Sequence, residues 1–317
     1  METLNSSFIE YIKQAVSLSK SSTHITEDNV FQEADLNILP FLDKMVDALV
    51  LPGSGVDGME NLEELLDKAE SGKSCLLLPE HYSNMDLSLI SSLIRYEGGR
   101  GESIAKAIVA IAGMKLSEDN PVVSTFASAY SRVIIFPSRS LQELDAEKDR
   151  AVIVRSNGIN RAAMKALLNI KTKGRLILVF PSGTRYRPWD PSTKRGVREI
   201  DSYIKSFDYM CPVAINGEVL HVRQGDMMED SVSRDLVRIT AGPVMSCSDF
   251  RDRVLAEVDA ANEAVKAAAG ADAAVSDYVD RLIDKKQSVA DSIMAILEEM
   301  HVRAEEKREL LQKKSGA

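Results

Sequence analysis

Apolar side chains in the first 58 residues recur at helical spacing in two groups. They are Phe8, Ile9, Ile12 and Val16, followed by Leu42, Met45, Val46 and Leu49. Side chains three and four positions apart lie on one face of a helix, so each group predicts an amphipathic helix. Gly53, Gly55 and Gly58 then interrupt the pattern and predict a loop. We therefore expect an N-terminal helical segment over residues 1–58.

Between residues 59 and 248, short apolar runs alternate with amphipathic stretches. The runs that predict strands are Cys75–Leu78, Ala107–Ile111, Val133–Phe136, Leu176–Phe180 and Val213–Ile215. The stretches that predict helices are Leu62–Glu70, Asp86–Tyr96, Ala151–Ile170 and Glu199–Phe207. A late pair, Val219–Val222 and Leu236–Thr240, is expected to add antiparallel strands. This alternation favours an α/β domain with a central mixed, largely parallel sheet flanked by helices.

The last segment, 249–317, is rich in alanine and charged residues and keeps helical spacing. Its apolar positions are Val275, Val279, Leu282, Val289, Ile293, Ile296 and Met300, with Lys286 interrupting the series. The pattern predicts a long amphipathic helix or an antiparallel helix pair. We expect this C-terminal helical extension to cap the core, and a dimeric coiled coil is the alternative.

Composition and charge narrow the class of protein. A chain of 317 residues with 44% hydrophobic residues can bury a sizeable core, in one large domain or two smaller ones. The net charge of −9 argues against a nucleic-acid partner, which needs a large basic surface. The three cysteines, Cys75, Cys211 and Cys247, form no CxxC motif, so we expect neither a disulfide framework nor a cysteine zinc site.

The sequence contains no long apolar stretch. Its first residues do not have the pattern of a signal peptide, and the longest small and apolar run, Ala107–Met114, is far short of a membrane span. We expect a cytoplasmic protein in a reducing compartment. Peripheral contact with a membrane surface is left open.

The first candidate for chemistry is the run Pro79–Asp86, which follows a predicted strand. In an α/β sheet, ligands and catalytic groups collect at the carboxyl ends of strands. A short loop would let the carboxylate of Asp86 reach a ring nitrogen of His81, fix its tautomer and stabilise the imidazolium formed on proton transfer. The alternative is that Asp86 only caps the helix it begins, because Ser83-x-x-Asp86 resembles a capping box.

A second candidate is Phe180–Pro188, which again ends a predicted strand. Five basic residues lie between positions 185 and 198, against a single acid, Asp190: Arg185, Arg187, Lys194, Arg195 and Arg198. Guanidinium groups bind phosphate oxygens through paired hydrogen bonds, and Gly183 lets the backbone approach a ligand closely. The alternative is a solvated basic loop held by Pro181, Pro188 and Pro191.

Arg139 follows a third predicted strand, Val133–Phe136, at the same expected edge of the sheet. One base and several arginines at one edge indicate proton abstraction from a substrate that carries phosphate. We expect no catalytic role for the other three histidines, which are His24, His221 and His301.

Four blocks in this order make the sequence resemble the glycerolipid acyltransferases. The blocks are His81-x-x-x-x-Asp86, Val133–Arg139, Phe180–Arg185 and Pro212–Ile215. Over about residues 70–245 it is most similar to the soluble, plastid-type glycerol-3-phosphate 1-O-acyltransferases, which carry Pro-Ser-Gly-Gly-Arg-Asp-Arg-Pro. This chain has Pro-Ser-Gly-Thr-Arg-Tyr-Arg-Pro at residues 181–188, so Thr184 replaces the second glycine. Glu80 stands where the family usually has Asn before the histidine.

The resemblance implies an acyltransferase domain over residues 59–248. It implies acyl transfer from an acyl thioester, carried by acyl carrier protein or coenzyme A, to the sn-1 hydroxyl of glycerol-3-phosphate, the first step of phospholipid synthesis. His81 would be the general base and Asp86 would orient it, with no metal or cofactor. The residues implied in binding the phosphorylated substrate are Arg139, Ser182, Gly183, Thr184, Arg185 and Arg187.

Two alternatives remain at this point. The same chemistry could use lysophosphatidate as the acceptor. A protein of another class, a non-catalytic acyl- or lipid-binding protein, would have His81 and Asp86 too far apart for a hydrogen bond.

Overall fold

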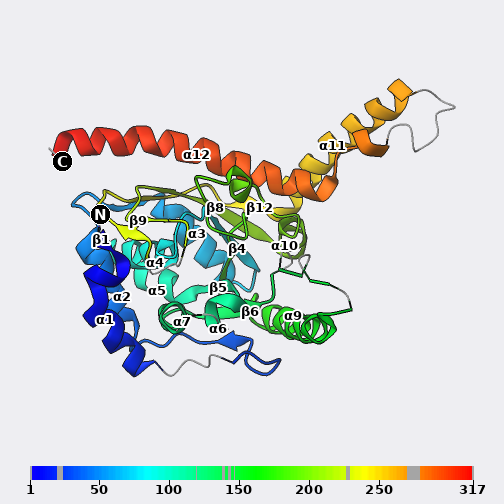
Figure 1. The fold of residues 1–317 in the computed structure, drawn as a ribbon. Coiled ribbons are helices and arrows are strands. Elements are labelled where there is room, and N and C mark those ends of the chain that lie inside the picture. The colour runs from blue at the N-terminus through cyan, green and yellow to red at the C-terminus, as the bar shows by residue number, and fades with distance from the viewer. Residues whose placement is uncertain are drawn as a thin grey trace.

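The computed structural model describes residues 2–19, 24–118, 120–137, 140–141, 144–145, 147–225, 229–269 and 279–315 (Figure 1). Its strands are β1 (Glu2–Thr3), β2 (Phe31–Gln32), β3 (Gly55–Asp57), β4 (Cys75–Pro79), β5 (Ile108–Gly113), β6 (Arg132–Ile135), β7 (Leu176–Leu178), β8 (Tyr209–Asn216), β9 (Leu220–His221), β10 (Ser231–Val232), β11 (Arg238–Ala241) and β12 (Met245–Ser246). Its helices are α1 (Leu4–Leu18), α2 (Leu39–Leu49), α3 (Met59–Glu70), α4 (Asp86–Tyr96), α5 (Gly101–Ala107), α6 (Met114–Glu118), α7 (Pro121–Ser128), α9 (Arg150–Ile170), α10 (Ile200–Ser206), α11 (Cys247–Ala269) and α12 (Lys285–Ser315).

Nine strands of the described residues form one sheet, in the order β2-β6-β5-β7-β4-β8-β11-β3, with β12 paired to β8. The five central strands, from β6 to β8, are parallel to one another. Strand β2 is antiparallel to β6, and strands β11 and β12 are both antiparallel to β8. The predicted mixed, largely parallel sheet flanked by helices is therefore confirmed. The carboxyl ends of β4, β7 and β6 lie at the same side of the sheet, and the His81 and 180–188 loops follow β4 and β7 there.

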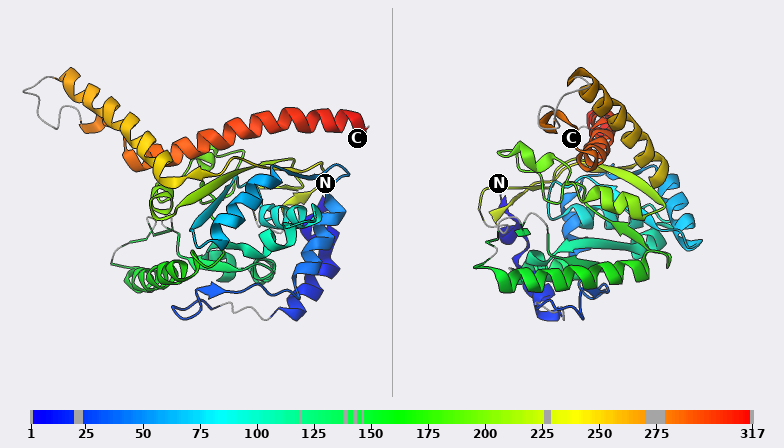
Figure 2. Two further views of the ribbon diagram at one scale, coloured as in Figure 1. Left: turned by 180° about the vertical axis from the view of Figure 1, so that it is seen from behind. Right: turned by 90° about the vertical axis from the view of Figure 1, so that its right-hand side faces the viewer.

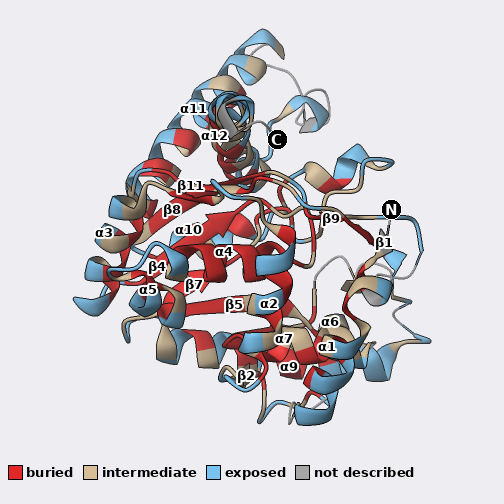
Figure 3. Cartoon of the chain, turned by 90° about the vertical axis from the view of Figure 1, so that its left-hand side faces the viewer, coloured by how far each residue is buried: buried red, intermediate tan, exposed pale blue. Residues whose placement is uncertain are grey.

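Both faces of the central strands are buried under helices. Leu77 of β4 packs into a core with α1 to α5, and Leu76 and Leu78 pack into a second core with α9 to α12. Figure 3 shows the sheet as a continuous buried layer between partly exposed helices. A strand covered on both sides favours apolar residues at every position, which is why β4 has an uninterrupted apolar run in the sequence.

The predicted elements of the middle segment are present, and most of their ends differ by a few residues. The helix predicted over Asp86–Tyr96 has those bounds, whereas β7 ends at Leu178, two residues before the prediction. The late pair of predicted strands is present and each strand is antiparallel to a neighbour, but the two strands lie in different sheets. Strand β9 belongs to a separate three-stranded sheet with β10 and β1, and β11 runs antiparallel to β8 in the main sheet.

The N-terminal segment is more than the helical layer that its pattern predicts. Helices α1 and α2 are present, but β2 and β3 also join opposite edges of the main sheet. Strand β3 lies within the glycine-rich stretch predicted as a loop, where it pairs in parallel with β11. With Val56 as its only apolar side chain, this strand carries no periodic signal in the sequence.

The C-terminal segment forms an antiparallel pair of helices, one of which crosses the body of the protein (Figures 1 and 2). Val289, Ile293 and Leu297 of α12 are fully buried in the second core, as the cap interpretation predicts. Val275, which was assigned to the same apolar series, lies outside the described residues. Among the described helices, none combines the length and the apolarity that crossing a bilayer requires.

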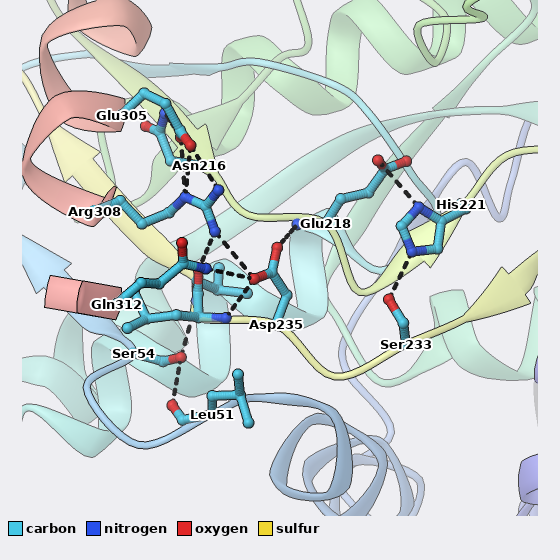
Figure 4. A network of polar contacts seen from close by, with 12 residues as sticks. Leu51, Ser54, Asn216, Glu218, His221, Ser233, Asp235, Glu305, Arg308 and Gln312 are labelled. Atoms are coloured by element: carbon cyan, nitrogen blue, oxygen red, sulfur yellow. Dashed lines mark hydrogen bonds and ion pairs between the residues drawn. The ribbon is translucent and has the colours of Figure 1, made fainter. Parts of the chain in front are cut away.

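The far end of α12 is held by a polar network (Figure 4). Arg308 donates to the Asp235 carboxylate at 3.0 Å and to the carbonyl of Leu236 at 3.2 Å. Glu305 accepts from Arg308 and from the side-chain amide of Asn216, which ends β8. Polar contacts near its C-terminal end therefore hold α12 in addition to the packing of its apolar face.

We predict that Ile293→Ala lowers the free energy of unfolding by about 2–5 kcal/mol, because it removes a fully buried side chain between α12 and the sheet. Ile293→Val, which removes one methyl group, should cost about 1 kcal/mol. Denaturant titration of the three proteins measures both values. Equal stability of Ile293→Ala and the wild type would show that α12 is not packed on the core.

Candidate active site

The loop between β4 and α4 brings His81 and Asp86 together. His81 Nδ1 lies 2.9 Å from Asp86 Oδ2, the contact expected from their spacing. Asp86 is the first residue of α4, where the helix dipole favours a negative charge. Its side chain is 2% exposed, whereas that of His81 is 16% exposed. The carboxylate is thus buried, and the ring remains within reach of a substrate.

The Asp86 carboxylate also accepts hydrogen bonds from the loop that carries His81. The donors are the backbone N–H of Tyr82 at 2.6 Å, the backbone N–H of Ser83 at 2.9 Å and the hydroxyl of Ser83 at 2.8 Å. The N-cap of α4 is Met85, which makes no side-chain cap hydrogen bond, so the Asp86 carboxylate holds the preceding loop and orients His81 rather than capping the helix. Because an ionised carboxylate can only accept, Asp86 favours the neutral tautomer in which Nδ1–H donates to it and Nε2 carries the free lone pair.

The second candidate segment lies directly against His81. The imidazole stacks on the ring of Phe180, with centroids 3.9 Å apart and planes inclined by 16°. The backbone N–H of Tyr186 donates to the carbonyl of His81 at 2.8 Å. The two candidate loops, about 100 residues apart in the chain, therefore form one surface.

The turn at Ser182, Gly183 and Thr184 is tight and internally bonded. The buried Ser182 hydroxyl donates to the carbonyl of Thr184 at 2.7 Å, and the N–H of Gly183 donates to the carbonyl of Phe180 at 2.9 Å. Gly183 has φ +65°, and a Cβ at this position would lie 3.1 Å from Val197. Both features favour glycine, so a structural turn accounts for Gly183 without a ligand.

Arg185 and Arg187 have different surroundings. Arg185 donates to Asp230 Oδ2 at 2.8 Å, and that carboxylate is 1% exposed. Arg187 is half-buried, and no carboxylate of the described residues forms an ion pair with its guanidinium. Arg187 is therefore the better placed of the two to bind an external anion.

Each basic residue at 194–198 forms an ion pair with a carboxylate from the C-terminal segment. Lys194 pairs with Glu298, Arg195 with Asp291 at 3.2 Å, and Arg198 with Asp284 at 2.7 Å. Asp291 and Glu298 belong to α12, and Asp284 immediately precedes it. The cluster thus fastens the C-terminal helix to the candidate site. Arg139, the remaining predicted arginine, lies outside the described residues.

His301, for which the sequence predicts no catalytic role, contacts the residues on either side of His81. His301 of α12 lies with its Nδ1 2.9 Å from Glu80 Oε2 and 3.3 Å from the Tyr82 hydroxyl. Its sequence signal was weak: His301 is four positions after the buried Leu297, so it continues the inward face of α12. By contrast, His221 lies in the separate small sheet, where it contacts Glu218 and Ser233 (Figure 4).

Burial by itself lowers the pKa of His301, but the hydrogen bond and the charge of Glu80 outweigh it, so the pKa lies above its ordinary value. Lys194 also lowers this pKa, and Glu305 raises it. Burial, together with the charge of Glu80, raises the pKa of the Tyr82 hydroxyl. Tyr82 therefore stays protonated and donates to Glu80 at 2.8 Å.

Comparison with known proteins identifies the family. A family model described as Acyltransferase matches residues 55–225, which is more than half of the chain. The chain belongs to this family, within the glycerolipid acyltransferase superfamily that its motifs resemble. The match includes His81, Asp86 and the 180–188 loop, and it ends before α11 and α12. No curated protein matches the sequence significantly.

We predict that the stability contributed by His301 depends on pH. A folded pKa above the unfolded value of about 6.5 gives a contribution that is complete below about pH 6.5 and is lost as the pH rises through the folded pKa. Wild type should therefore exceed His301→Gln in unfolding free energy by more at about pH 5.5 than at about pH 9. Urea titrations at both pH values measure this difference, and a pH-independent difference would contradict it.

Proposed function

We propose that the protein transfers an acyl group from an acyl thioester to the sn-1 hydroxyl of glycerol-3-phosphate. The observation that carries this proposal is the hydrogen bond of 2.9 Å between His81 and the buried Asp86, beside a loop with a half-buried arginine. Family membership supplies the reaction class, acyl transfer to a glycerolipid acceptor. The acceptor itself is inferred from the resemblance of residues 181–188 to the plastid-type motif.

In the proposed reaction, His81 Nε2 takes the proton of the primary hydroxyl as the oxygen attacks the thioester carbonyl. The tetrahedral intermediate then collapses, the carbon–sulfur bond breaks, and the imidazolium returns its proton to the departing thiolate. The products are the acylated glycerol phosphate and a free thiol. Asp86 stabilises the imidazolium between these two steps, because its buried carboxylate accepts a hydrogen bond from Nδ1–H and remains ionised.

The phosphate of the acceptor would lie against the 182–187 loop. Arg187 is assigned the main contact because its guanidinium has no ion-pair partner among the described residues. Arg185 would contribute donors not used by Asp230, and the resemblance adds Arg139 together with the Ser182–Thr184 turn. The donor is acyl carrier protein or acyl coenzyme A, and its contacts are not assigned to residues 194–198, which pair with carboxylates.

Lysophosphatidate is the second candidate acceptor, because Thr184 restores the Gly-Thr-Arg sequence of the wider family. Incubating the protein with one donor and either acceptor distinguishes the two. A non-catalytic lipid-binding protein is less well supported, because that alternative expects His81 and Asp86 to lie apart.

We predict that His81→Ala lowers kcat for acyl transfer by at least about 100-fold, the lower range of general base catalysis. Asp86→Asn should also lower kcat strongly, because an amide cannot stabilise the imidazolium in the same way. Steady-state assays with glycerol-3-phosphate and an acyl thioester measure both effects. Full activity of His81→Ala would exclude the proposed mechanism.

We predict that Arg187→Ala raises KM for glycerol-3-phosphate by about 10-fold or more, with KM for the donor little changed, because one charged hydrogen bond to phosphate is lost. Arg198→Ala is the matched control. It removes the same side chain eleven positions away, where Arg198 pairs with Asp284. Equal effects of the two substitutions on the acceptor KM would contradict the assignment of Arg187.

A further inference from the structure

A second buried carboxylate lies immediately before His81. Glu80 is 4% exposed and accepts three hydrogen bonds: from the N–H of Ile215 at 2.9 Å, from the Tyr82 hydroxyl at 2.8 Å and from His301 Nδ1 at 2.9 Å. A carboxylate taken out of water is stable only when its oxygens find such donors. Two of the donors belong to the matched family region, and the third comes from α12.

Tyr82 connects Glu80 to the candidate catalytic pair. Its hydroxyl donates to Glu80, and its backbone N–H donates to Asp86 at 2.6 Å. Both neighbours of His81 in the chain are therefore fixed by hydrogen bonds. Glu80 is fixed by the donors to its carboxylate, and Tyr82 is fixed by its bonds to Glu80 and Asp86. The ring of Tyr82 also packs edge-on against Tyr186 and lies 5.7 Å from the ring of His301.

His301 is held in place by contacts on both sides of it along α12. The side-chain amide of Asn216 donates to the carbonyl of His301 at 3.0 Å and to Glu305 at 2.8 Å. Figure 4 shows Asn216 and Glu305 side by side in this anchoring network. On the other side, Glu298 pairs with Lys194, which lies shortly after the 180–188 loop. The part of α12 that carries the His301 imidazole is thus held on both sides by contacts with the rest of the protein.

We infer that His301 is a positioning residue of the active site: by holding Glu80 and Tyr82, it keeps His81 in the orientation required for proton transfer. This inference rests on the proposed function. It makes α12, which lies outside the matched family region, part of the catalytic apparatus. It also gives a role to Glu80 in the position where the family usually has Asn.

The test compares three variants of the full chain. His301→Ala should lower kcat by about 10-fold, the equivalent of about 1.4 kcal/mol, with both KM values within about twofold of wild type. His301→Gln should restore most of kcat, because its amide can donate to Glu80. Lys307→Gln, which removes an ion pair between α12 and Asp57, is the matched control and should leave kcat unchanged.

A second readout does not depend on turnover. The hydrogen-bonded Nδ1 proton of His81 is followed by NMR in the same proteins. Its resonance should shift or broaden in His301→Ala and stay at the wild-type position in His301→Gln and Lys307→Gln. A wild-type protein without turnover would overturn the proposed function, and the resonance would then decide whether His301 positions His81.

The double variant Glu80→Gln/His301→Ala completes the design. If His301 acts through Glu80, the double variant should be no slower than Glu80→Gln alone. Additive losses in kcat would overturn the inference. An unchanged His81 resonance in His301→Ala, or an equal loss of kcat in His301→Ala and Lys307→Gln, would also overturn it.

Discussion

The buried carboxylate of Asp86 is the constraint on which the candidate site depends. Removed from water at the start of α4, it needs donors, and it takes them from the Tyr82 and Ser83 amides, the Ser83 hydroxyl and His81. The same bonds therefore fold the loop and orient the imidazole. The parallel sheet places these groups together, because β4 and its neighbour β7 end at the same side of the sheet. The His81 loop follows β4 there, and the 180–188 segment follows β7.

The elements and contacts that could be predicted from the sequence are those formed by residues close to one another in the chain. The β4 run, the α4 bounds and the His81–Asp86 contact all lie within about twenty residues, and each follows from local spacing. Short edge strands such as β2 and β3 could not be predicted, because they bury few side chains and their position is set by distant partners. His301 lies 221 positions from Glu80, so only the folded chain brings them together.

The basic segment at 194–198 shows how a local charge count can mislead. Within the segment, cations outnumber acids, and this pattern is typical of an anion-binding surface. The carboxylates that neutralise it lie about 90 residues later, on α12 and just before it. Half-exposed ion pairs of this kind contribute little stability individually. They connect α12 and the residue before it to the segment that follows the 180–188 loop, while the buried face of α12 supplies the packing.

The path of α12 has a consequence for the order in which the protein matures. The strands, both candidate loops and their cations are synthesised before the helix that completes them. Until α12 emerges and docks, the second core lacks Val289, Ile293 and Leu297, and the carboxylate of Glu80 lacks one donor. A nascent chain that has only reached the end of the matched region therefore carries an unfinished site, which is completed only when α12 docks.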